Sequence, residues 1–279
     1  MERGSVGHCR FGGNCSLKLS VIVPYWGPGK KSYDLAIRLW QREKDIELLQ
    51  WAGGYLCTFN NSLPRCFDLG AKRATGDLLA FAVPEALPWE GWSKACLEWA
   101  DRGPEVFWGA GSTLFLRRTE TEGLLSLSDA IPVIDEMYAT RALADWGTKV
   151  PNGERRENEA RGIFVISREL FDSVGRWNPL ALFGWQGIEM ERRIRGVCGL
   201  DARDDRMPQP LWVTWGSKPL MKVDHARNLY KDVLGWKRMK QVVKAAEENP
   251  HGVVRALVRA NRMPIWSTNV GFEAPEMVI

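Results

Sequence analysis

The chain has 279 residues, 45% hydrophobic and 26% charged, so it can bury a sizeable core as one large domain or two small ones. A net charge of +4 is too small to imply a polyanionic partner by itself. No apolar run approaches the roughly 18 residues of a spanning helix, and the six scattered cysteines include no C-x-x-C pair. We therefore expect a soluble, cytoplasmic protein with reduced thiols and no transmembrane segment. Fourteen tryptophans weakly favour a ligand-binding enzyme.

The first hundred residues alternate between strand and helix patterns. Short apolar runs closed by proline or glycine predict buried strands, and apolar residues at helical spacing between them predict helices. The predicted strands are 17–23, 46–51 and 77–82, and the predicted helices are 32–44, 66–74 and 88–100. This order implies a parallel sheet with right-handed crossovers and ligands at the carboxyl ends of its strands.

The pattern is less regular in the second half. Residues 106–117 predict a pair of strands, and the polar stretch that follows, 119–158, has no assigned structure. Its run 153–161 is expected to be a solvated loop. Further predicted strands are 162–166 and 210–215, and further predicted helices are 168–174, 187–196 and 228–249.

The segment 181–195, ALFGWQGIEMERRIR, carries the most informative functional pattern. Gly184 and Gly187 flank Trp185 and predict a turn that opens a helix. Glu189 then falls in the first helical turn, where amide donors favour an ionised carboxylate, so a catalytic base is one interpretation. The other is an amphipathic surface helix in which Glu189 only forms solvated ion pairs.

FGWQGIEMERRIR resembles the F-x-G-W-G-G-E-D-x-E-x-x-x-R segment of GT-A glycosyltransferases, especially family 2 and the β-1,4-galactosyltransferases. GIFVISRELFDSVGRWN resembles their G-x-x-x-x-x-R-x-x-F-x-x-x-G-x-[FW] stretch. LSVIVPYWG and FNNSLPRCFDLGAKRATGDLLAF resemble the first strand with its nucleotide-binding loop and the stretch that leads to the metal site. These matches are collinear over about 17–225.

The resemblance implies an α/β, GT-A (Rossmann-like) fold with a mixed central sheet and C-terminal helices. The expected organisation is an N-terminal extension (1–16), a GT-A-like domain (17–225), basic helices (226–262) and a tail (263–279).

The resemblance also implies a nucleotide-sugar donor, with a UDP-sugar as the first candidate. Pro24 and Tyr25 would lie near the base and Asp77 near the ribose or diphosphate. Where the family carries D-x-D to hold Mn²⁺ or Mg²⁺, this chain has Val83-Pro84-Glu85, so only Glu85 can coordinate.

A second metal ligand is implied at His225, which matches the family's C-terminal ligand histidine. The alternative is a histidine at a helix start with no ligand role. Without a metal, cations such as Arg73 would neutralise the departing diphosphate.

The resemblance places Glu189 at the general base, which would deprotonate the acceptor hydroxyl opposite the leaving diphosphate and so invert configuration. Ile188 replaces the family's first acid. Trp185 and Gly187 are implied to contact the acceptor, although core packing also explains Trp185.

The predicted activity is inverting transfer of a sugar to a hydroxyl of a glycan, a protein or modified DNA. Two alternatives stay open. One is a catalytically degenerate nucleotide-sugar-binding protein. The other is a transferase that reaches modified nucleic acid through its basic C-terminal helices, because ten basic residues and four acidic ones give 222–262 a net charge of +6. A merely solvated basic face is the plainer interpretation.

Overall fold

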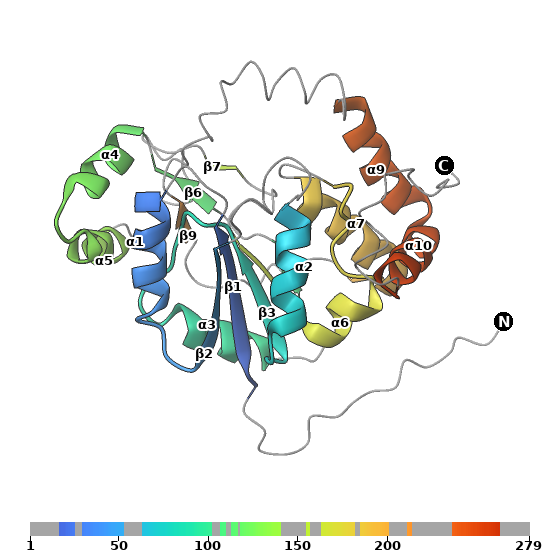
Figure 1. Cartoon of the computed structure of the whole chain (residues 1–279), viewed down its shortest axis with the longest axis horizontal. Coiled ribbons are helices and arrows are strands. Elements are labelled where there is room, and N and C mark those ends of the chain that lie inside the picture. Colours follow the sequence, from blue (N-terminus) through green and yellow to red (C-terminus); the bar gives the residue numbers. More distant parts are fainter. Residues whose placement is uncertain are drawn as a thin grey trace.

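A computed structural model gives the structure of the chain (Figure 1). It describes residues 17–25, 30–52, 63–101, 107–109, 113–116, 118–140, 155–156, 163–181, 185–200, 211–213 and 236–262. Statements about structure below concern these residues. None of the described helices combines the length and the hydropathy needed to cross a bilayer.

A mixed central sheet has the strand order β2-β1-β3-β8-β5. The strands are β1 (Leu19–Tyr25), β2 (Ile46–Ala52), β3 (Leu78–Ala82), β5 (Phe107–Gly109) and β8 (Ile163–Ser167). The first three are parallel, whereas β8 runs antiparallel to both β3 and β5. Every residue of β3 is buried, as expected for a strand covered on both faces.

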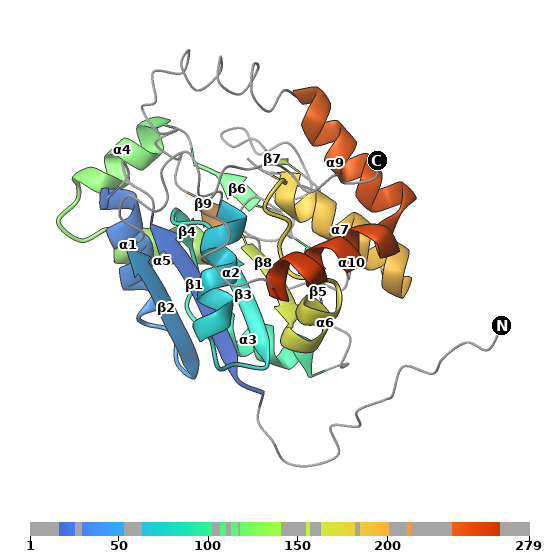
Figure 2. The same ribbon diagram turned by 45° about the vertical axis from the view of Figure 1, so that its right-hand side comes forward.

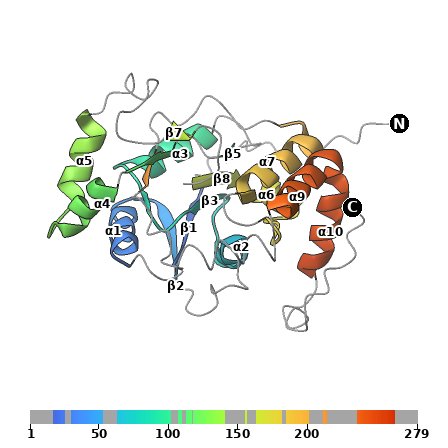
Figure 3. The same cartoon turned by 90° about the horizontal axis from the view of Figure 1, so that it is seen from above.

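Helices cover both faces of this sheet. In Figure 3, α1 (Lys30–Trp40) and α3 (Trp92–Ala100) lie on one side, and α2 (Leu63–Arg73), α6 (Arg168–Ser173) and α7 (Trp185–Cys198) lie on the other. The crossover from β1 to β2, through α1, and the crossover from β2 to β3, through α2, therefore run over opposite faces. The predicted α/β fold with a mixed central sheet and C-terminal helices is confirmed.

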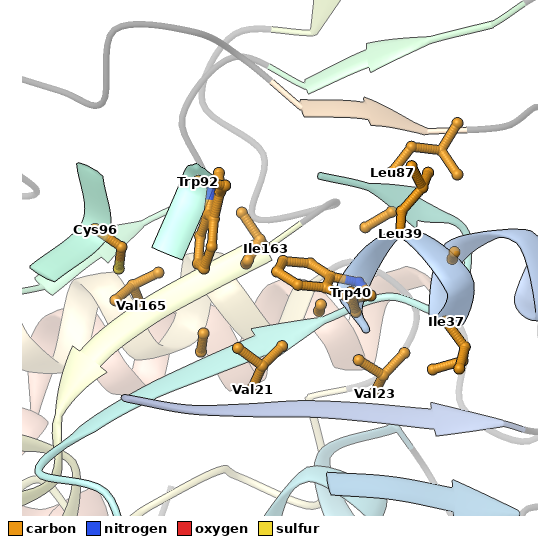
Figure 4. Packing of buried hydrophobic residues seen from close by; sticks show 14 of the residues in the cluster. Val21, Val23, Ile37, Leu39, Trp40, Leu87, Trp92, Cys96, Ile163 and Val165 are labelled. Atoms are coloured by element: carbon orange, nitrogen blue, oxygen red, sulfur yellow. The ribbon is translucent and has the colours of Figure 1, made fainter. Parts of the chain in front are cut away.

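Tryptophans fill much of the described core. On the α1 side, Trp40 meets Trp92 edge to face with ring centroids 5.0 Å apart (Figure 4). On the α2 side, Trp177 packs against Phe67, Phe81 and Phe164 at 5.2–5.6 Å. These tryptophans account for part of the unusual composition by packing rather than by ligand binding.

The predicted strand pair at 106–117 is wrong in its pairing. β5 joins the central sheet, whereas β6 (Thr113–Phe115) joins a smaller sheet of order β4-β9-β6-β7. The other strands of that sheet are β4 (Ala86–Leu87), β7 (Arg155–Arg156) and β9 (Leu211–Val213). Two adjacent short strands thus take different partners because distant segments, not the local sequence, supply their hydrogen bonds.

Two helices lie in the stretch that the sequence left unassigned, α4 (Arg118–Ser126) and α5 (Ile131–Thr140). Each turns few apolar residues inward, such as Leu124 in α4 and Ile134 and Tyr138 in α5. Arg42 binds Asp135 through two hydrogen bonds of 2.7 and 2.9 Å, which ties α5 to the end of α1.

The C-terminal helices α9 (Trp236–Glu248) and α10 (Pro250–Arg262) pack on α7 (Figure 2). Two glycines allow this close approach. A Cβ on Gly196 would lie 2.5 Å from Cγ of Pro250, and one on Gly175 would lie 3.0 Å from Cβ of Leu257. The helix predicted at 228–249 is present as α9 from residue 236, and its earlier part lies outside the described residues.

Candidate functional site

The topology places a switch point at the carboxyl ends of β1 and β3. β1 lies between β2 and β3, and the connecting helices α1 and α2 cover opposite faces. In such sheets the crevice beyond these strand ends is the usual ligand site. β1 ends here with Pro24 and Tyr25, and β3 leads into Val83-Pro84-Glu85. The structure thus brings Pro24, Tyr25 and Glu85 to one edge of the sheet.

α7 begins towards the same edge. β8 is antiparallel to β3, so Ser167 and the following α6 lie at the amino ends of the parallel strands. Arg193 donates to the carbonyl of Val174 just after α6, which places this later part of α7 near that opposite edge. α7 therefore begins towards the carboxyl ends (Figure 1), and Trp185 and Gly187 lie in its first turn, about two turns before Arg193.

Among the described acidic residues, Glu85 follows most closely along the chain after a strand that ends at the switch point, three residues after the end of β3. Its side chain is partly buried, and this burial raises the pKa of the carboxyl to about 7. A carboxyl with this pKa changes charge easily when a cation or a ligand approaches. Shifted groups of this kind cluster at functional sites, although burial alone also produces them.

At the carboxyl ends of β1 and β3, Glu85 is the one predicted carboxylate ligand for the metal that the resemblance implies. No three His, Cys, Asp or Glu side chains gather in the part of the chain that the structure describes. Hard divalent ions prefer several oxygen ligands, so Glu85 alone does not fit such an ion. His225 lies outside the described residues, so a Glu85–His225 site stays a prediction.

Glu189 lies in the second turn of α7, not the first, because the helix begins at Trp185 rather than at residue 187. Its side chain is fully buried. Arg193, also fully buried, donates from Nε to Oε1 and from Nη2 to Oε2, both at 2.8 Å. Nδ2 of Asn178 donates to Oε1 at 3.1 Å. The solvated surface pair considered for Glu189 is therefore wrong.

This pairing gives Glu189 a structural role. Asn178 also accepts from the N–H of Leu180, and Arg193 reaches the carbonyl of Val174, so the group links α7 to 174–180. A general base needs one oxygen facing the acceptor hydroxyl. Both oxygens of Glu189 face Arg193 here, so proton removal requires that pairing to open.

Arg73 and Asp77 do not join the site, contrary to the prediction for both. Arg73 ends α2 and Asp77 precedes β3, whereas Glu85 follows β3, so a whole strand separates them. At that opposite edge Asp77 accepts from the N–H of Lys18 at 3.2 Å. The motif match ignored the topology. A connection from a helix to the next parallel strand lies at the amino ends of the strands, opposite the proposed ligand site.

Arg168, which lies within the segment that resembles the family, also lies at this opposite edge and has a structural role there. Its guanidinium donates to the carbonyls of Ala71, Ala74 and Gly76 at 2.8–3.2 Å. These include carbonyls at the end of α2, where no further helical N–H can reach them. Arg168 therefore caps the C-terminal end of α2 and holds the turn before β3.

One partly buried acid was missed, Asp68 of α2. It accepts from the N–H of Trp177 at 3.3 Å, and burial raises its pKa to about 7 against the opposing charges of Arg176, Lys72 and Arg193. The spacing offered a signal, because residues 64, 67, 68 and 71 recur on one helical face. That face carries Pro64, Phe67 and Ala71, all buried.

Three predicted contacts remain without side-chain detail. Gly187 is buried in the first turn of α7. The backbones of Tyr25 and Trp185 are described, but their side chains lie outside the described part, so their donor and acceptor roles stay predictions.

No protein-family model matches the chain, and no curated protein matches it. Among solved structures, a mannosyltransferase from Pyrobaculum calidifontis with GDP-Man and Mn²⁺ is 11% identical, with a TM-score of 0.39 over 92% of this chain and 79% of that one. Glucosyl-3-phosphoglycerate synthase from Mycobacterium tuberculosis, with Mn²⁺, UDP and phosphoglyceric acid, is 12% identical, with a TM-score of 0.40 over 83% and 78%. Drosophila β1,4-galactosyltransferase 7 with xylobiose is 13% identical, with a TM-score of 0.37 over 74% and 66%. None of these values assigns a role to a residue of this chain.

Proposed function

We propose that the chain is a glycosyltransferase that binds a nucleotide-sugar, a UDP-sugar first, at the carboxyl ends of β1 and β3. The observation that carries the proposal is the strand order, with antiparallel β8 beside β3. It joins β1, which opens the nucleotide-binding motif, and β8, which leads through α6 towards the sugar-transfer motif in α7, in one sheet although they are far apart in sequence. Pro24, Tyr25 and Glu85 provide the donor side, and the start of α7, with Trp185 and Gly187, provides the acceptor side.

The proposed reaction is an inverting displacement. The acceptor hydroxyl oxygen forms a bond to the anomeric carbon while the bond from that carbon to the diphosphate oxygen breaks. The nucleoside diphosphate leaves with the electron pair, and the hydroxyl proton passes to a carboxylate. Glu189 is the proposed acceptor of that proton. It serves in this way only when one oxygen leaves Arg193.

The second candidate is a protein that binds a nucleotide-sugar without transferring it. The pairing of Glu189 with Arg193 favours it, because a carboxylate held on both oxygens is poorly placed to remove a proton. Binding of the donor with neither transfer nor hydrolysis supports this candidate.

The first test is the thermal shift of the protein with a panel of nucleotide-sugars, each with and without Mn²⁺. A donor at about a hundred times its dissociation constant adds about 2.7 kcal/mol and raises Tm by roughly 5 °C or more. We expect Glu85→Gln to lose most of the shift. Glu90→Gln serves as the control, because Glu90 is exposed and lies away from the proposed donor site. Its neighbour Gly91 donates an N–H to Glu43, which precedes β2 at the amino ends of the parallel strands.

The outcomes test the proposed donor site. A shift that needs Mn²⁺ supports the Glu85–His225 metal site, and one without Mn²⁺ supports donor binding that needs no metal. No shift with any donor, or equal shifts in the two variants and the wild type, contradicts the proposed donor site.

A further inference from the structure

The two C-terminal helices bury one face and expose the other. In α9, Val242 and Ala246 are buried, whereas Lys240 and Lys244 are exposed. In α10, Leu257 is buried, whereas Arg255 and Arg259 are exposed. The period of 3.6 residues puts each basic pair roughly opposite the buried residues of its helix. The apolar faces are thus used for packing on the α/β body, and the basic faces are turned to solvent.

These helices hold a concentrated positive charge. Residues 236–262 contain seven basic and two acidic residues, a net charge of +5 that exceeds the +4 of the whole chain. The two acids lie close to cations, since Glu247 is 3.8 Å from Arg192 and Glu248 is 3.5 Å from Lys244. α10 itself contains three arginines and no acidic residue. The uncompensated charge therefore lies in α10 and the first half of α9.

The contacts between α7 and α9 relate this charge to the candidate site. Arg192 faces Glu247, and Gly196 faces Pro250, the first residue of α10. The residue numbers differ by 55 and 54, so α7 and α9 run side by side in the same direction, as Figure 2 also shows. The same offset puts Lys240 level with Trp185, where α7 begins. The basic row of α9 thus starts beside the proposed acceptor side.

We infer that the exposed faces of α9 and α10 bind the phosphate backbone of a nucleic acid, which presents its acceptor hydroxyl at the start of α7. This inference rests on the proposed function for the transfer step, but not for binding. Basic residues spread over two helices suit a chain of phosphates better than a single phosphate. A lipid surface is disfavoured, because an interfacial helix inserts an exposed apolar face, and here those faces are buried.

The test is equilibrium binding of the full chain to a short DNA duplex and to the matching single strand, at about 50 and about 200 mM salt. We expect the affinity to fall steeply with salt, with a slope of about −0.9 per contacted phosphate on the duplex. Lys240→Ala/Lys244→Ala and Arg255→Ala/Arg259→Ala should each weaken binding roughly tenfold or more at the lower salt and reduce the slope by about one to two. These side chains are exposed, so the variants should fold.

The matched control is Lys44→Ala/Lys94→Ala, which removes two exposed lysines far along the chain from α9 and α10. Lys44 precedes β2, and Lys94 lies in α3. Binding that is independent of salt, or an equal loss in the control, overturns the inference. So does binding to phosphatidylserine vesicles without binding to either DNA. Failure of the proposed function appears separately, as DNA binding without any donor-induced thermal shift. A donor-induced shift without DNA binding rejects only the inference.

Discussion

Asp68 shows how one partly buried acid makes stability depend on pH. Burial in α2 raises its pKa from 3.8 to about 7, so the folded chain holds this proton more tightly than the unfolded chain does. Its favourable contribution is complete below about pH 4 and is lost as the pH rises towards 7. Glu85 adds a contribution of the same sign in the same range. Stability against unfolding should therefore decline between pH 4 and 7 at these two positions.

Asp68→Asn should remove part of this decline. The amide keeps an oxygen that can accept from the N–H of Trp177 but carries no charge at high pH. Relative to the wild type, we expect a gain of about 1–3 kcal/mol near pH 8 and little change near pH 4, measured by urea unfolding. Asp101→Asn, at an exposed residue after α3, controls for a general loss of negative charge. An equal effect at both pH values would contradict the assignment.

At the scale of the element, the Glu189–Arg193 pair fixes α7 along its buried face. Glu189→Gln leaves Arg193 as a buried cation without its anionic partner and should cost about 3–5 kcal/mol in urea unfolding. Glu189→Leu/Arg193→Met removes both charges and should recover most of that loss. Unchanged stability of the single variant would contradict a buried pair.

The folded double variant then separates the two roles of Glu189. Loss of transfer by about 10²–10⁴-fold, with donor binding retained, assigns Glu189 to proton removal. Transfer within about tenfold of the wild type assigns it to holding α7 and leaves the base to another residue. The control for altered charge alone is Arg176→Met. It breaks the ion pair of Arg176 with Asp172, which lies near the segment 174–180 that contacts α7.

The elements that local pattern decides were predictable from the sequence. The strands at 17–23, 46–51 and 77–82 are apolar runs that the sheet buries, so their positions agree with the structure to within two residues. The pairing of β5 and β6 was not predictable, because residues far along the chain form their partner strands. The roles of Arg73 and Asp77 failed for another reason, since a residue between a helix and the next parallel strand lies at the amino edge. Burial of both Glu189 and Arg193 depends on packing by α6 and the following turn, which spacing of four residues does not reveal.

At the scale of the whole molecule, the basic helices are part of the folded body. α10 rests on Gly175, whose φ of +83° is a conformation that side-chain-bearing residues rarely adopt. A Cβ there would lie 3.0 Å from Cβ of Leu257 and 3.3 Å from the carbonyl oxygen of Val254. Gly196 makes room for Pro250 in the same way. Two glycines outside the C-terminal region thus determine how closely its helices approach α6 and α7.

Gly175→Ala tests this dependence. Both the positive φ and the contact with Leu257 oppose the added methyl, so we expect a loss of about 1–3 kcal/mol together with faster amide hydrogen exchange throughout α10. Gly123→Ala is the matched control, because Gly123 lies within α4 with open space around its Cβ position, where alanine should add about 0.5–1 kcal/mol. If α10 were a separate unit, Gly175→Ala would leave its exchange unchanged. If it belongs to the body, the same substitution should also weaken DNA binding by the basic faces, since their position depends on this contact.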